Sequence, residues 1–159
     1  MKESDTDVLV VGGGVGGGSA AALAVTTLGK RAIRTKETDW LGGQLTTQAV
    51  PPDEHRWIEH FGCTRSYRQF RNLVRQFYKD HYPLTSVARS DPQLNPGKGN
   101  VSRLCHEPKV AVAVLDQMMA YAIASGKLQI KRYLKPISVE TRGDYISAVT
   151  FQHTQTNLT

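Results

Sequence analysis

A run of glycines directly after a short apolar stretch restricts most strongly what this chain can fold into. Val8 to Val11 are all apolar, without alternation, which predicts a short strand buried on both faces. Six of the next seven residues, 12–18, are glycines. Glycine loses more conformational freedom on folding than any other residue, so a run of this kind indicates a specific structural demand.

The spacing of the glycines indicates what that demand is. Gly12, Gly14 and Gly17 form the pattern Gly-x-Gly-x-x-Gly, and an alanine-rich segment follows up to Gly29. Between a strand and a helix, this pattern allows a tight turn, close approach of a pyrophosphate, and close packing of the helix on the strand. The helix N-terminus adds free N–H groups and a favourable dipole. We therefore predict a nucleotide site at the glycines, followed by a helix that Gly29 ends in a left-handed turn. The alternative interpretation of the glycine run is a flexible segment without a ligand.

The second strand of this unit is expected at residues 31–36. Arg34 occupies a position at which a buried parallel strand normally carries an apolar residue. Because an unpaired buried charge costs several kcal/mol, we expect Arg34 to reach solvent or to pair with an acid.

Residues 65–82 have the periodicity of an amphipathic helix. The apolar residues recur every three or four positions and predict one buried stripe: Tyr67, Phe70, Val74 and Phe77. The basic residues of this helix are expected on a solvated face: Arg68, Arg71, Arg75 and Lys79.

Turn formers and capping residues divide the rest of the chain. Residues 83–102 are rich in Pro, Gly, Asn and Ser and predict an irregular connection. Pro108 and Gly126 are typical of the first and last positions of a helix, whose Met118 and Met119 we expect in the core. The remaining expected elements are a strand at 128–134, a hairpin of 137–140 and 145–151 around Arg142-Gly143-Asp144, and a frayed polar end at 152–159.

Length and composition are those of an ordinary globular domain. The 159 residues are 40% hydrophobic and 21% charged, and they include no apolar run long enough to span a bilayer. Residues 1–7 do not form the start of a signal peptide, so we expect a cytoplasmic protein without membrane association.

The net charge of +6 favours an anionic partner, either a nucleotide or nucleic acid. Cys63 and Cys105 form no metal-binding pattern, so no metal is expected.

Residues 37–46, Glu-Thr-Asp-Trp-Leu-Gly-Gly-Gln-Leu-Thr, resemble the N-terminal part of bacterial FAD-dependent oxidoreductases that carry a T-D-W-[LI]-G-G-Q signature. The resemblance covers most of the chain. It continues through residues 49–55, 61–64, 66–68, 80–83 and 101–105. It implies an oxidoreductase of the glutathione-reductase-like architecture, with FAD as the cofactor whose isoalloxazine performs the hydride chemistry.

The resemblance also implies where the cofactor binds. In such proteins an acid at the end of the second strand holds the adenosine ribose, and Glu37 has the expected spacing to Gly42-Gly43. The candidate cofactor-binding residues are Gly12, Gly14, Val15, Gly16, Gly17, Lys36, Glu37, Gly42, Gly43 and Gln44.

The expected fold class is α/β. We predict a single domain over 1–159, in which 1–50 is a Rossmann-like FAD-binding βαβ unit, 51–126 a helical insertion, and 127–151 a returning strand with a hairpin. The chain departs from its relatives in the extra length at Gly18-Ser19, in Arg34 and Lys36, and in ending early. We therefore expect an incomplete domain, a fragment that binds FAD weakly or not at all.

No residue is assigned a catalytic role, and the substrate and oligomeric state are not predicted. His55, His60, His81 and His106 are interpreted as surface or structural residues. Two alternatives remain open. Arg34 and Lys36 are suited to the 2′-phosphate of NADP, and the basic helix at 65–82 is suited to nucleic acid, although we expect no nucleic-acid partner.

Overall fold

The computed structural model describes residues 3–156. The chain forms two compact units, of which the first comprises Met1–Leu41 and Met119–Thr159 and the second Gly42–Met118. No helix in the described part of the chain is both long and apolar enough to cross a membrane.

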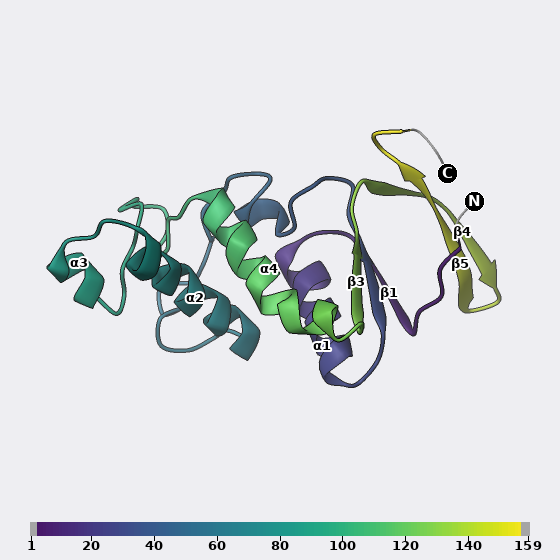
Figure 1. Cartoon of the computed structure of the whole chain (residues 1–159), viewed down its shortest axis with the longest axis horizontal. Helices are drawn as coiled ribbons and strands as arrows, with labels where there is room; N and C mark the ends of the chain where they lie inside the picture. Colours follow the sequence, from purple (N-terminus) through teal and green to yellow (C-terminus); the bar gives the residue numbers. More distant parts are fainter. Residues whose placement is uncertain (1–2, 157–159) are drawn as a thin grey trace. The chain divides into compact units, whose positions relative to one another are not determined.

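A three-stranded parallel sheet organises the first unit (Figure 1). Its strands β1 (Val8–Val11), β2 (Ala32–Thr35) and β3 (Leu128–Lys131) lie in the order β1-β2-β3. All four residues of the central strand β2 are buried. The prediction that β1 is buried on both faces is wrong, because Val8 and Val11 are 36% and 47% exposed. Within the described residues β1 pairs only with β2 and is an edge strand.

The glycine run forms a turn into a helix, as predicted. A single π-helical segment, η1 (Val15–Ala20), leads directly into α1 (Ala21–Thr27). The wider winding is visible where the Ser19 N–H donates to the Gly14 carbonyl, five residues earlier, at 3.1 Å. Gly29, with φ of +80°, ends the helix in the left-handed conformation, which confirms that expectation.

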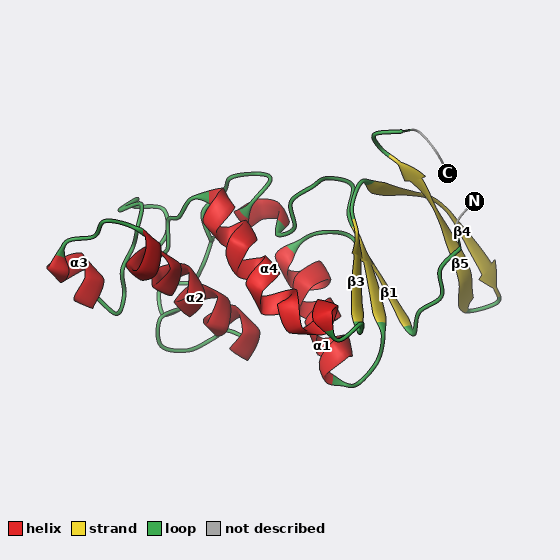
Figure 2. Cartoon of the chain, in the orientation of Figure 1, coloured by secondary structure: helices red, strands yellow, loops and turns green. Residues whose placement is uncertain are grey.

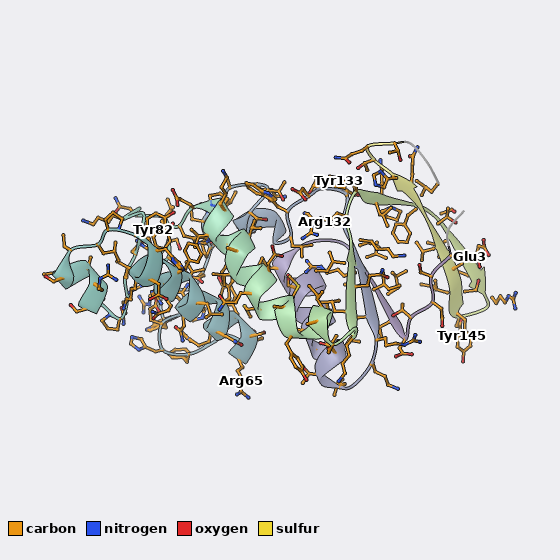
Figure 3. The ribbon with its side chains drawn as sticks, in the orientation of Figure 1. Glu3, Arg65, Tyr82, Arg132, Tyr133 and Tyr145 are labelled. Carbon is orange, nitrogen blue, oxygen red and sulfur yellow. The ribbon has the colours of Figure 1, made fainter. Side chains whose placement is uncertain are left out.

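A two-stranded antiparallel sheet completes the first unit (Figure 2). The predicted strand at 128–134 is divided in two, because Tyr133 adopts φ of +61° and β4 begins at the next residue. Strands β4 (Leu134–Arg142) and β5 (Tyr145–His153) form the predicted hairpin around Gly143, whose φ is +60°. Tyr145 projects from this hairpin and is 80% exposed (Figure 3). The expected frayed end is ordered as strand up to His153, and residues 157–159 lie outside the described part.

The second unit is helical. It contains the 3₁₀ turn η2 (Gly43–Leu45), α2 (Arg65–His81), α3 (Ser86–Ser90), and α4 (Pro108–Ala124) as far as Met118. The hydroxyl of Thr64 accepts from the Tyr67 N–H at 3.2 Å and caps α2. The predicted bounds of α2 and α4 are confirmed to within a residue or two. The buried core residues include Phe70, Val74, Tyr78, Leu94, Leu104, Val110, Val114 and Leu115.

The irregular connection before α4 is held by one amide side chain. Asn95 donates to the carbonyls of Gly99 and Ser102, both at 3.0 Å, and accepts from the Cys105 N–H at 2.7 Å. Apart from the short helix α3, the predicted lack of regular structure over 83–102 is confirmed.

Candidate functional site

The turn between β1 and η1 has the backbone shape that the glycine pattern predicts. Gly12 adopts φ of +121°, a region closed to other residues without strain. Gly14 has an ordinary φ of −66°, and a Cβ built on it meets nothing within 4 Å. A Cβ built on Gly16 also meets nothing within 4 Å. Val15 is half-buried, and Gly17 lies within η1. The turn therefore offers open space beside Gly14 and Gly16.

Arg34 lies under this turn. Of the two expected alternatives, it does not reach solvent, since its exposed fraction is 0%, but it is not buried without a partner. Its guanidinium donates to the carbonyls of Gly12 at 3.4 Å and Gly14 at 3.1 Å, and to the hydroxyl of Ser19 at 2.8 Å. The Met119 sulfur lies 3.6 Å from Nη1, and this methionine is in the core as predicted. Peptide dipoles of the turn thus hold the arginine inside the unit.

The extra glycine and the arginine are a matched pair. A Cβ on Gly18 would lie 2.6 Å from Nη2 of Arg34 and 2.9 Å from the Gly12 carbonyl oxygen. The π-helical winding of η1 and the missing side chain at Gly18 together make room for the guanidinium. Two departures from the expected sequence pattern, separated by 15 residues, are therefore one structural feature.

Lys36, rather than Glu37, lies against the turn. A Cβ built on Gly13 would stand 1.9 Å from Cδ of Lys36, so the lysine chain passes directly over that glycine. The side chain of Glu37 is exposed, and its backbone carbonyl accepts from the Thr154 hydroxyl at 3.1 Å. Burial lowers the pKa of Lys36, and the nearby charge of Arg34 lowers it further, while Glu37 partly offsets both.

The Gly42-Gly43-Gln44 segment belongs to the second unit and has a packing role there. Gly42 adopts φ of +110°, and a Cβ on it would lie 2.6 Å from Thr46 and 2.8 Å from Leu115. Gly43 also has a positive φ, of +53°, and begins η2 together with Gln44. Close packing of this loop on α4 therefore favours glycine at position 42, and the positive φ favours glycine at position 43. Both preferences exist without a cofactor.

A buried ionic cluster lies on α2 in the second unit. Arg71 is 0% exposed and contacts the carboxylates of Glu54 and Glu59, while Arg75 donates to Glu59 at 2.6 and 3.1 Å. The prediction that these arginines face solvent is wrong, because two acids from the preceding loop neutralise them. Tyr67 also donates to Glu54, at 2.5 Å.

The charges of this cluster stabilise one another. Burial alone would raise the pKa of Glu59, but the bonds and charges of Arg75 and Arg71 outweigh it and lower the pKa. Burial disfavours the charged form of Arg71, yet Glu54 and Glu59 raise its pKa. Burial and the Glu54 carboxylate raise the pKa of Tyr67, which stays protonated at neutral pH. The cluster is thus a set of compensated ions that joins the loop to α2.

The imidazole of His106 has a lowered pKa. Burial lowers its pKa, and the bond of Nδ1 to the Leu104 carbonyl, at 2.8 Å, acts in the opposite direction. Its Nε2 is buried with no hydrogen-bond partner. The remaining three candidates, His55, His60 and His81, are exposed.

Comparison with known proteins identifies the family. A family model described as FAD dependent oxidoreductase matches residues 7–159. The chain belongs to the FAD-dependent oxidoreductase family. The expected family, its cofactor FAD and the α/β, Rossmann-like fold are confirmed. No curated protein matches.

A solved structure shows the same fold as this FAD-dependent oxidoreductase. The glycerol-3-phosphate dehydrogenase from Bacillus halodurans, complexed with FAD, matches with a TM-score of 0.54 and 15% sequence identity. The match covers 98% of this chain and 32% of the dehydrogenase chain. The chain therefore spans about a third of the length of that protein.

The two alternative ligands are not favoured. Arg34 is buried and donates to the glycine turn, so it does not present its guanidinium to a 2′-phosphate. Arg71 and Arg75 are buried in ion pairs, so α2 does not present them as a basic face to nucleic acid. The sequence pattern missed the buried acids Glu54 and Glu59; the only signal was their position in a loop preceding an unusually arginine-rich helix.

Proposed function

We propose that the glycine turn of the first unit binds the ADP part of FAD, and that the chain supplies the N-terminal, FAD-binding part of a flavin-dependent oxidoreductase. The observation that carries this proposal is the open space beside Gly14 at a turn that leads into a helix. A pyrophosphate fits such a turn because backbone N–H groups approach it without an intervening side chain.

The roles of the residues follow from their places. Gly12 makes the turn, Gly14 and Gly16 leave room for the phosphates, and Val15 with Gly17 begins the helix that faces them. When bound, FAD supplies the hydride-accepting isoalloxazine, and the protein supplies its position. We further propose that Gly42, Gly43 and Gln44 contact the cofactor, in addition to their packing role. A cytoplasmic location stays a prediction.

Titration of the purified chain with FAD, followed by flavin fluorescence, tests the proposal. Of the two outcomes expected for an incomplete domain, this proposal requires weak but saturable binding in the wild type, and a loss of about tenfold or more in Gly14→Val, because the branched side chain fills the open space. The fold should tolerate this change, since φ of Gly14 suits any residue. The thermal unfolding midpoint of each protein provides the control. Equal FAD affinity in both proteins would contradict the proposal.

A further inference from the structure

The residue directly after β2 is fixed by the sheet. The Lys36 N–H donates to the Lys131 carbonyl at 3.0 Å, and the Lys36 carbonyl accepts from the Leu134 N–H at 2.8 Å. The N–H and the carbonyl of Lys36 are thus hydrogen-bonded to the end of β3 and to the start of β4. Lys36 is therefore held at the carboxyl edge of the sheet, where ligands of open α/β sheets bind.

The side chain of Lys36 extends from this fixed point across the glycine turn. Its Cγ, Cδ and Cε lie 2.8, 1.9 and 2.8 Å from the position that a Cβ on Gly13 would occupy. A side chain at position 13 would displace the lysine chain, whereas one at position 18 would meet both Arg34 and the backbone carbonyl of Gly12. The turn carries one cationic side chain under it and a second one over it.

This arrangement changes what the site can recognise. A carboxylate at the end of the second strand accepts hydrogen bonds from ribose hydroxyls, whereas an ammonium group has three donors and no acceptor. Glu37, the neighbouring acid, has its side chain in solvent. The group that lies on the turn is thus suited to an anion rather than to a ribose diol.

The electrostatics of the turn favour the same ligand. The charge of Arg34 acts on Lys36 and disfavours its ammonium form, so an anion bound by Lys36 offsets this repulsion. The helix dipole at η1 and α1 adds positive potential at the turn. A diphosphate that lies over the turn is favoured by the lysine and by the helix N-terminus, while Arg34 stays buried beneath.

Building on the proposed function, we infer that this site selects its nucleotide by the diphosphate, through Lys36, and that the ribose hydroxyls add little to affinity. Lys36 is a specificity-determining residue of the cofactor site. Gly13 and Arg34 are the residues that position it and set the charge of its surroundings.

Competition against FAD tests this inference with four ligands: ADP, 2′-deoxy-ADP, adenosine and inorganic pyrophosphate. In the wild type we expect ADP and 2′-deoxy-ADP to bind within about threefold of each other, and adenosine to bind far more weakly. Lys36→Met, which keeps the chain length, should lose about tenfold to a hundredfold in ADP affinity. Glu37→Gln, which tests the ribose contact, should stay within about twofold of the wild type, and Lys30→Met, at an exposed position, is the matched control.

The outcomes separate the inference from the function on which it rests. If FAD and ADP fail to bind the wild type, the proposed function is wrong and the inference is wrong with it. If both bind but Lys36→Met binds ADP normally, or 2′-deoxy-ADP and Glu37→Gln each lose about tenfold, only the inference is overturned. Pyrophosphate binding as tight as that of ADP would identify a free-phosphate site instead of a nucleotide site. Circular dichroism of Lys36→Met excludes unfolding as the cause.

Discussion

Arg34 in the first unit and Arg71 in the second are both 0% exposed, but they are held in different ways. Arg71 lies between the carboxylates of Glu54 and Glu59, and its charge is neutralised within the cluster. Arg34 donates to backbone carbonyls of the glycine turn, and its charge still acts on Lys36. The difference teaches that a buried arginine such as Arg71 joins elements together, whereas one such as Arg34 shapes a turn and acts on the charge of a neighbouring lysine.

The largest expected effect comes from breaking the ionic cluster. Glu59→Gln removes the carboxylate that contacts Arg71 and Arg75 and leaves both guanidinium groups undercompensated. We expect a loss of about 3–5 kcal/mol in the free energy of unfolding, measured by urea denaturation. An exposed acid on α2, the helix that carries Arg71 and Arg75, supplies the control, since Asp80→Asn should change stability by less than about 0.5 kcal/mol.

Removing the arginine under the turn should cost less. Arg34→Met keeps the length of the side chain but deprives the carbonyls of Gly12 and Gly14 of a donor. We expect a loss of about 1–3 kcal/mol, seen as faster amide hydrogen exchange in β1 and β2. Lys30→Met, at an exposed position, is the matched control. A cost equal to that of Glu59→Gln would show that the two arginines do not differ as described.

The pairing of Arg34 with Gly18 gives a smaller, more specific effect. Gly18→Ala places a Cβ 2.6 Å from Arg34 Nη2, so it should destabilise the wild type. In the Arg34→Met background the cost should fall by at least about 0.5 kcal/mol, although the contact with the Gly12 carbonyl remains. A double-mutant cycle measured by urea denaturation gives this coupling energy. Strict additivity would mean that the glycine and the arginine are independent.

The smallest expected effect is a dependence of stability on pH. The pKa of Glu59 is lowered in the folded chain, so its contribution to stability is present above the ordinary Glu pKa and is lost as pH falls through the lowered value. Stability of the wild type should therefore decline on acidification below about pH 4.3. The decline should be shallower in Glu59→Gln, as measured by unfolding titrations at several pH values. Parallel curves for the two proteins would contradict this assignment.

The sequence predicted the elements whose causes are local. The apolar stretch at Val8–Val11, the glycine pattern, and the caps at Pro108 and Gly126 each lie within or beside the element that they define, and the structure confirms those elements. The exposure of β1 was not predictable in this way, because apolar residues do not reveal how many neighbours a strand has. It depends on the pairing of strands.

The buried charges were mispredicted because their compensation is distant in the sequence. Arg71 is paired with Glu54, 17 residues earlier, and Arg34 donates to the carbonyl of Gly12, 22 residues earlier. A periodic pattern reports which residues are polar but not which of them meet. Which of Lys36 and Glu37 lies against the glycine turn also could not be predicted, because the two differ by one position and spacing rules for the strand end are not that fine.

The β4–β5 hairpin has a consequence for how the protein behaves at high concentration. Ile137, Val139 and Ile146 are 48%, 54% and 68% exposed on a sheet of only two strands. Such a ribbon is a template on which another extended chain can add, and aggregation begins in this way. Pro136 removes one backbone donor, and two register shifts within β4, between Pro136 and Ser138 and between Glu140 and Thr141, twist the strand away from a flat edge. Pro136 and the two register shifts of β4 therefore protect the hairpin against the addition of further strands.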